Sequence, residues 1–156
     1  MKQTVQMDRI QEKMQPGVFT RDGFLGSDRR KLIDILIEDD EAVKRMDLTH
    51  QKIAERLIEL RDAGMRGLGE FINIEPHYEV GVGSVRGKLP CPFGDPGIFP
   101  KTNITVRNTK LGREVIFTDM HIHLIDSHGF YEGKGSPFRL EPAALVEILD
   151  IQPTQE

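Results

Sequence analysis

The side chains most suited to chemistry gather between Phe117 and His128, where the chain reads Phe-Thr-Asp-Met-His-Ile-His-Leu-Ile-Asp-Ser-His. This stretch holds three of the five histidines, His121, His123 and His128, and it adds the carboxylate of Asp119. Imidazole and carboxylate groups are common ligands of transition metals, and both also transfer protons in enzymes. The stretch is therefore the first candidate for a metal site or an acid–base site.

The same stretch alternates between apolar and polar residues, a pattern typical of a strand that buries one face. The alternation predicts a strand over residues 113–126 whose open face carries Asp119, His121 and His123. Side chains two residues apart on such a face lie about 6.5–7 Å apart, so that two imidazoles can turn toward one ion. Nitrogen and oxygen ligands of this kind suit zinc, iron or nickel, which predicts a divalent transition metal as the cofactor.

A third ligand would come from elsewhere in the chain. His77 and Glu79 repeat the two-residue spacing on another predicted strand, and Cys91 is the only cysteine. The predicted metal ligands are His121, His123, His128, Asp119 and His77. A metal with an open position could also activate a water molecule, with Asp119, Asp126 or Glu79 as the base. The competing interpretation is a solvated polar strand face without any metal.

The helices expected in the N-terminal half follow from capping residues and apolar spacing. Residues 1–26 are polar and rich in turn residues, and predict a polar lead-in with a loop. Ser27 is a good N-cap for a helix that closes near residues 39–40 and is followed by a short helix through Met46. Thr49 can cap a third helix. The apolar stripe of that helix is Ile53, Leu57, Ile58 and Leu60.

β-Branched and aromatic residues become frequent after Gly69, which favours strands. The predicted strands cover residues 71–75, 78–85, 103–108, 113–126 and 137–140. Segment 87–102 contains four prolines and three glycines, and predicts an irregular loop around Cys91. Cys91 would be either a buried small side chain, or a metal ligand or reactive thiol. Residues 142–150 predict a closing helix, because Pro142 suits its first turn.

Together these elements predict an α+β protein in which three N-terminal helices pack on an antiparallel, β-rich C-terminal half. The strands of that half would form an open sheet or a small barrel. The chain divides into a polar lead-in at 1–26, a helical segment at 27–69 and a β-rich segment with a closing helix at 70–156. At 156 residues these segments fit one compact domain.

Residues 43–57 are similar to the helix-turn-helix pattern, with Thr49 as the cap of the second helix. With the predicted strands that follow, the chain resembles a winged helix over residues 28–82. The resemblance implies a DNA-binding regulator, and the histidines would make it a metal-sensing one, similar in layout to the ferric-uptake-type regulators. The residues also allow a plain packing unit, because Glu55 and Glu59 interleave with the basic side chains of the proposed recognition helix.

Composition limits the remaining classes of function. Hydrophobic residues make up 38% of the chain and charged residues 29%, which suits a soluble, folded protein. The net charge is −4, so a nucleic-acid partner is disfavoured and would need a local basic patch. A single cysteine excludes an intrachain disulfide and a multi-cysteine zinc or iron–sulfur site. The polar N-terminus and the absence of a long apolar run predict a cytoplasmic protein without a membrane partner.

These observations favour a metal- or small-ligand-binding protein that uses the His-x-His of residues 121–123. A small-molecule ligand and a homo-oligomer are both compatible with the sequence. Two alternatives remain open, a winged-helix regulator and a structural or assembly protein without a site. The sequence also leaves open whether the protein is an enzyme, because no pairing of a nucleophile with a base is visible.

Overall fold

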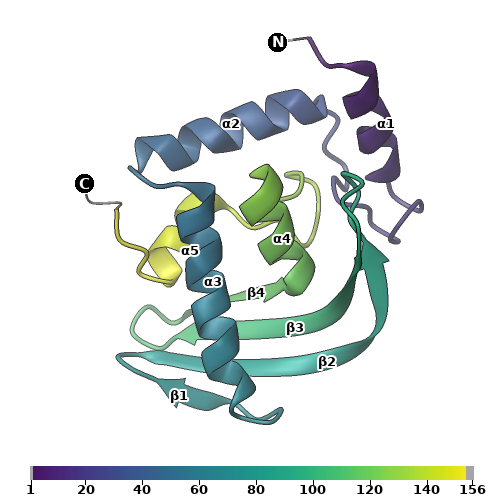
Figure 1. Ribbon diagram of the computed structural model, residues 1–156. Coiled ribbons are helices and arrows are strands. Elements are labelled where there is room, and N and C mark those ends of the chain that lie inside the picture. The colour runs from purple at the N-terminus through teal and green to yellow at the C-terminus, as the bar shows by residue number, and fades with distance from the viewer. Residues whose placement is uncertain (1, 154–156) are drawn as a thin grey trace.

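The computed structural model describes residues 2–153, whose helices lie over one face of a curved antiparallel sheet (Figure 1). The α+β class predicted from the sequence is therefore confirmed. In chain order the elements are α1 (Val5–Lys13), α2 (Leu32–Arg45), α3 (His50–Met65), β1 (Ile72–Ile74), β2 (Tyr78–Pro90), β3 (Ile98–Asn108), β4 (Arg113–Thr118), α4 (Asp119–His128) and α5 (Pro142–Ile148).

The sheet has four strands, which are antiparallel neighbours in the order β1-β2-β3-β4. Residues on its inner face pair across the strands, as Val80 does with Val106 and Ile104 with Phe117. All four of these side chains are fully buried beneath the helices. Within residues 2–153 the first and last strands do not pair with each other, so the sheet is open and the alternative of a small barrel is wrong.

Helix α3 packs on this sheet through the apolar stripe that the sequence predicts. Ile53, Leu57 and Leu60 are buried on its inner side. The hydroxyl of Thr49 caps the helix by accepting a hydrogen bond of 3.1 Å from the Lys52 N–H. The predicted third helix and its cap are therefore confirmed.

A second hydrophobic cluster joins α1, α2 and α4 to the loop that follows β2. Its buried members are Met14, Phe24, Leu25, Leu32, Ile35, Cys91, Met120, Leu124 and Phe130. The predicted polar lead-in at residues 1–26 also contains a helix that the sequence did not predict, α1, and it contributes buried residues to this cluster. Thr4 caps α1, and Met7, Ile10 and Met14 follow at helical spacing toward the cluster. The polar residues between them concealed this spacing in the sequence.

Helix α2 continues through Asp39 and Asp40, where the sequence predicted its end, and it begins later than the predicted cap Ser27. Asp39 is buried and accepts two hydrogen bonds of 2.7 Å from the guanidinium of Arg139. Asp40 pairs with Lys44 one helical turn later, at 2.8 Å. Both carboxylates therefore have partners while the helix continues, but the partner of Asp39 lies outside the helix and is too distant in sequence to be anticipated.

The predicted strand over residues 113–126 is correct only in its first part, because β4 ends at Thr118 and α4 begins immediately afterwards. Two hydrogen bonds cap the helix. The Thr118 hydroxyl accepts from the His121 N–H at 3.3 Å, and the Thr118 N–H donates to His121 Nδ1 at 3.1 Å. This is a capping box in which histidine replaces the usual glutamate or glutamine, so the sequence did not display it.

Other strand predictions also change. β2 and β3 extend into segment 87–102, where Leu89 pairs with Phe99, and only residues 91–97 form the connecting loop. A register shift between Val85 and Lys88 lets the strands bend before they enter this proline-rich stretch. Residues 137–140 form turns instead of a strand. The predicted closing helix is confirmed as α5, with a proline in its first turn.

Candidate metal centre

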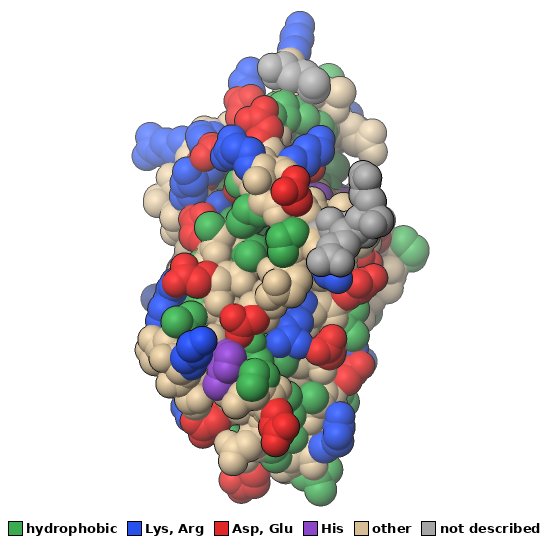
Figure 2. Space-filling model, turned by 90° about the vertical axis from the view of Figure 1, so that its left-hand side faces the viewer, with side chains coloured by type: hydrophobic (Ala, Val, Ile, Leu, Met, Phe, Trp, Pro, Cys, Tyr) green, Lys and Arg blue, Asp and Glu red, His purple; other side chains and the backbone are tan. Residues whose placement is uncertain are grey.

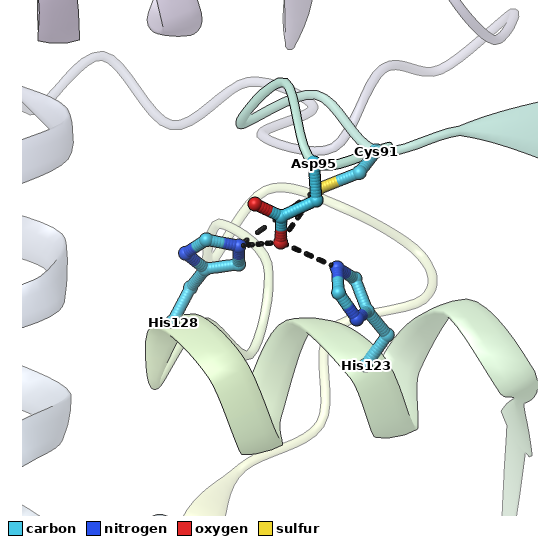
Figure 3. Close-up of side chains that lie close together, drawn as sticks. All are labelled: Cys91, Asp95, His123 and His128. Atoms are coloured by element: carbon cyan, nitrogen blue, oxygen red, sulfur yellow. Dashed lines mark hydrogen bonds and ion pairs between the residues drawn. The ribbon is translucent and has the colours of Figure 1, made fainter. Parts of the chain in front are cut away.

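Helix α4 and the loop between β2 and β3 bring four potential metal ligands together (Figure 3). His123 and His128 come from α4, and Cys91 and Asp95 come from the loop above it. One nitrogen, oxygen or sulfur atom from each residue lies within 4.8 Å of the corresponding atoms of the other three. Folding thus joins segments that are well separated in the sequence.

The Asp95 carboxylate lies at the centre of this cluster. Its Oδ2 atom is 2.8 Å from Nε2 of His123 and 2.7 Å from Nε2 of His128. The Cys91 sulfur completes the group, 3.8 Å from the same oxygen and 3.9 Å from Nε2 of His128. The four side chains therefore point toward one small volume from two sides.

One ring nitrogen in the cluster lacks a hydrogen bond. Nε2 of His123 is buried, and its contact with Asp95 is close but does not have the geometry of a hydrogen bond. Buried polar atoms are nearly always hydrogen-bonded, since leaving one unsatisfied costs about 1–3 kcal/mol. An ion at the centre of the cluster would supply the missing partner.

Aromatic rings fix the orientation of both histidines. Phe93 stacks on His128 with ring centres 4.0 Å apart and planes at 7°, and Phe99 stacks on His123 at 4.4 Å and 28°. The edge of Phe130 packs against Phe93 at 5.7 Å. These contacts hold the imidazoles in place and exclude water from one side, as preorganised ligand sites require.

The loop itself is built to return Asp95 over Cys91. Gly94 donates its N–H to the Cys91 carbonyl at 3.0 Å, which closes a turn. Gly94 and Gly97 have φ angles of +92° and +102°, a backbone region that side chains disfavour. The hydrogen bond from His128 holds the pKa of Asp95 below its ordinary value of 3.8, although desolvation opposes the shift. Asp95 is therefore ionised at neutral pH, as a metal ligand must be.

The spacing of the four atoms suits a tetrahedral ion. Zinc–ligand distances of about 2.0–2.3 Å place neighbouring ligand atoms about 3.3–3.6 Å apart. The aspartate–histidine separations of 2.7 and 2.8 Å are shorter than this, and the sulfur separations of 3.8 and 3.9 Å are longer. Side-chain movements of about 0.5 Å would bring these contacts to the tetrahedral spacing. The residues present therefore fit a metal ion.

The other residues that the sequence proposed as ligands lie outside the cluster, each with a partner of its own. Nε2 of His121 is 2.6 Å from Glu132. Asp119 pairs with Arg61 at 2.9 Å, and His77 pairs with Asp150 at 2.8 Å at the far end of β2.

Two further residues proposed as bases are not members of the cluster. Asp126 is exposed on α4, and Glu79 pairs in register with Arg107 on β3.

Asp95 is the member of the cluster that sequence reasoning missed. It lies in the loop whose prolines and glycines predicted no regular structure, so no local pattern indicated where the Asp95 side chain points. A signal was nevertheless present. Cys91 and Asp95 form a Cys-x3-Asp pair, and His123 and His128 form a His-x4-His pair, a combination that supplies four mixed ligands.

Comparisons with known proteins leave this geometry as the main guide to function: no family model, no curated protein and no solved structure matches the chain. Among residues 2–153, no helix has the length and apolar character needed to cross a membrane.

Proposed function

We propose that the protein binds one divalent transition metal ion, zinc in the first place, with Cys91, Asp95, His123 and His128 as its ligands. The observation that carries this proposal is the buried Nε2 of His123, which lacks a hydrogen bond and shares its small volume with the other three ligand atoms. A cluster that served only packing would leave that nitrogen without a hydrogen bond, and its contact of 2.8 Å with Asp95 would compensate its desolvation only in part.

The donor set favours zinc over the other divalent ions. A thiolate and two imidazoles disfavour magnesium, calcium and manganese, which prefer oxygen ligands. Zinc accepts sulfur, nitrogen and oxygen ligands together in tetrahedral geometry, and four protein ligands fill its coordination sphere. A closed sphere supports a structural or metal-sensing role more than hydrolysis, which needs an open position.

Bound metal would fasten the loop between β2 and β3 to α4. Cys91 belongs to the second hydrophobic cluster, so the metal would also tie α4 to the packing of α1 and α2. Because binding favours the folded state by mass action, zinc would raise the free energy of unfolding. Asp95 has a side chain that is 35% exposed, and it is the ligand through which the metal would exchange with solvent.

Metal loading of the purified, untagged protein tests this proposal. We expect elemental analysis to find close to one zinc per chain after incubation with zinc and desalting. Cobalt in place of zinc should give the visible bands of a tetrahedral ion and a near-ultraviolet thiolate band. Cys91→Ser should remove the thiolate band, and His123→Ala and His128→Ala should abolish retention of the metal.

The matched control is His77→Gln, which removes a histidine that lies outside the cluster and should leave loading unchanged. Circular dichroism and a dispersed proton–nitrogen NMR spectrum would establish that each variant is folded. A folded parent protein that retains neither zinc nor cobalt would overturn the proposal, as would equal loss of metal in the control.

A further inference from the structure

A cavity of about 340 Å³ opens beside the N-terminal end of α4, and none of the four proposed metal ligands lines it. Three separate parts of the chain form its walls: the loop at 20–24, the adjoining ends of β2 and β3, and the loop at 132–138. Its volume falls within the range of small-molecule sites, which are commonly formed where loops from different elements meet. The cavity is independent of the metal proposal.

The walls of this cavity are largely apolar. Phe24 and Met120 are buried at its inner surface, and Leu89 and Phe99 contribute from the two strands. Phe138 completes the wall, although it is 55% exposed and therefore stands where the cavity meets solvent. Large apolar side chains around an open cavity favour an apolar ligand body, because its burial releases water from both surfaces.

A buried carboxyl group lies in the same wall. Glu132 is 5% exposed, and its side chain accepts a hydrogen bond from the Ser136 hydroxyl at 3.0 Å. Nε2 of His121 lies 2.6 Å from this carboxyl group and also forms a hydrogen bond of 3.0 Å with the Phe138 carbonyl. These groups are satisfied within the chain. The interior offers no lysine or arginine side chain to an anionic ligand group, so such a group would lie at the mouth.

The mouth carries basic side chains. Arg21 is exposed and Lys101 is half-buried, and neither forms an ion pair among the residues that the structure describes. Asp22 also lies there, which leaves one net positive charge on the rim. We infer that the cavity binds an organic monocarboxylate whose apolar body fills the interior and whose carboxylate lies beside Arg21 and Lys101.

Three probes of equal chain length test this inference: decanoate, decanol and decyltrimethylammonium, each kept below the concentration at which it forms micelles. We expect decanoate to bind most tightly, with shifts of the Met120 methyl and Gly23 amide NMR signals. An exposed ion pair contributes about 0.2–1 kcal/mol, so Arg21→Ala and Lys101→Ala should each weaken decanoate binding up to about fivefold. Neither change should weaken decanol binding.

Two further variants make the result specific. Phe138→Ser should weaken decanoate and decanol alike, and Lys52→Ala, which removes an exposed lysine of α3, should weaken neither. The metal-ligand variant His128→Ala should still bind decanoate, so failure of the metal proposal would not affect this one. Equal binding of all three probes, absence of binding, or shifts confined to residues outside the cavity would each overturn the inference.

Discussion

The two ends of α4 hold their histidines in opposite conditions. At the N-terminal end both ring nitrogens of His121 have partners, in Thr118 and Glu132. Toward the C-terminal end, His123 and His128 converge on one oxygen of Asp95, and His123 Nε2 has no hydrogen bond. A polar side chain whose hydrogen bonds are all made within the chain stabilises the fold. Side chains that converge without a full set of hydrogen bonds can instead bind a ligand.

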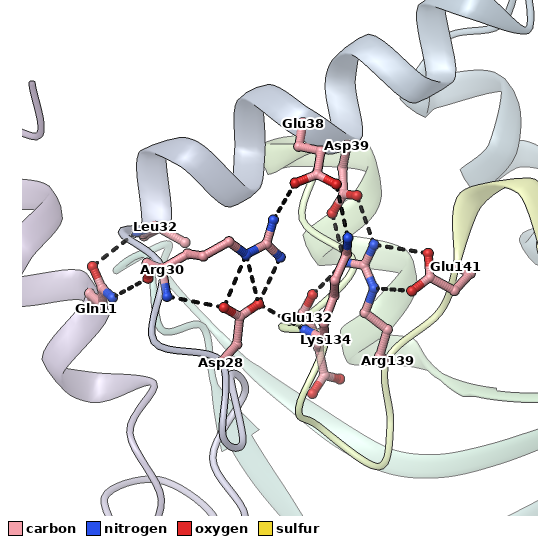
Figure 4. A network of polar contacts seen from close by, with 10 residues as sticks. All are labelled: Gln11, Asp28, Arg30, Leu32, Glu38, Asp39, Glu132, Lys134, Arg139 and Glu141. Atoms are coloured by element: carbon pink, nitrogen blue, oxygen red, sulfur yellow. Dashed lines mark hydrogen bonds and ion pairs between the residues drawn. The ribbon is translucent and has the colours of Figure 1, made fainter. Parts of the chain in front are cut away.

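The satisfied end belongs to a larger polar network that ties residues 129–141 to α2 (Figure 4). Arg139 is central to it, since it bonds both carboxylate oxygens of Asp39 and also reaches Glu141. Burial opposes the charge of Arg139 most strongly, but the hydrogen bonds that Arg139 donates to Asp39 and Glu141 together outweigh it and raise the pKa of Arg139. In the same network the backbone N–H of Lys134 donates a hydrogen bond of 2.9 Å to the Asp28 carboxylate.

The largest expected effect comes from breaking this network at Arg139→Met. The change leaves the Asp39 carboxylate buried without its partner, which should lower the free energy of unfolding by about 3–5 kcal/mol. Urea denaturation of the zinc-free protein measures this loss. The control is Arg113→Met, which removes an exposed ion pair with Glu147 and should cost less than about 1 kcal/mol. Similar losses in both variants would contradict the assignment of the network to the fold.

Zinc should produce the next largest effect, at the other end of α4. A free zinc concentration one hundred times its dissociation constant would raise the free energy of unfolding by about 2.7 kcal/mol. Thermal denaturation with zinc and with a chelator measures the gain. Cys91→Ser should lose most of it, whereas Arg113→Met should retain it. A gain that is the same in Cys91→Ser would remove the thiolate from the proposed site.

A pair of leucine substitutions sharpens the comparison. His121→Leu removes the hydrogen bond with the Phe138 carbonyl, the contact with Glu132 and the acceptor of the Thr118 N–H, which should cost about 1–3 kcal/mol while zinc is still retained. His123→Leu should abolish zinc retention and should cost the zinc-free protein less than His121→Leu, because Nε2 of His123 contacts Asp95 at 2.8 Å without a hydrogen bond. Loss of zinc from a folded His121→Leu variant would show that the N-terminal end of α4 also takes part in zinc binding.

What the sequence could predict was local. Thr49 and the stripe of Ile53 and Leu57 identified α3 correctly, because a cap and a helical period are contained in one segment. α4 was mistaken for a strand because its apolar residues alternate, and because His121 takes the capping position that glutamate usually holds. The orientation of the Asp95 side chain depends on how its loop packs against α4. The spacing of apolar residues in the sequence gives no information about such a contact.

Acid should destabilise the polar network of Figure 4, and substitution of Asp28 should show how much of this loss comes from its ion pair with Arg30. Hydrogen bonds from Arg30 hold the pKa of Asp28 well below its ordinary value of 3.8, and burial only partly opposes them. Because the pKa of Asp28 is lower in the folded state, its ionised form stabilises the protein at pH values above the ordinary pKa. This stabilisation is lost as the pH falls below that value toward the pKa of the folded state. Asp28→Asn should therefore be less stable at pH 7 and lose less stability than the parent below about pH 4.

Urea midpoints between neutral pH and about pH 2 measure this dependence. The exposed Asp34 provides the control, since Asp34→Asn should follow the parent at every pH. If Asp28→Asn and the parent lose the same stability as the pH falls, the ion pair between Asp28 and Arg30 does not stabilise the folded protein at neutral pH.

The smallest effect is expected on α3, where the sequence allowed a DNA-recognition helix. The buried side of this helix faces the sheet, and two of its basic residues are already engaged. Arg56 bonds the Leu149 carbonyl at 2.9 Å and also pairs with Glu59, and Arg61 pairs with Asp119. Acidic and basic side chains are intermingled over the face of the molecule in Figure 2. Phosphate binding requires basic charge to dominate a surface, so these contacts favour a packing role.

Lys52 is the basic side chain of α3 that tests this role most cleanly, because it is exposed and lies in the first turn, away from the buried stripe. Reversing Arg56 would also remove its contact with Leu149, whereas the side chain of Lys52 has no hydrogen bond or ion pair among residues 2–153 to lose. We expect Lys52→Glu to alter the free energy of unfolding by less than about 0.5 kcal/mol and to leave zinc retention unchanged. Fluorescence anisotropy against genomic fragments at low salt should show no specific binding by either protein. Sub-micromolar, salt-sensitive binding that Lys52→Glu abolishes would instead support the winged-helix alternative, because each neutralised phosphate releases counterions.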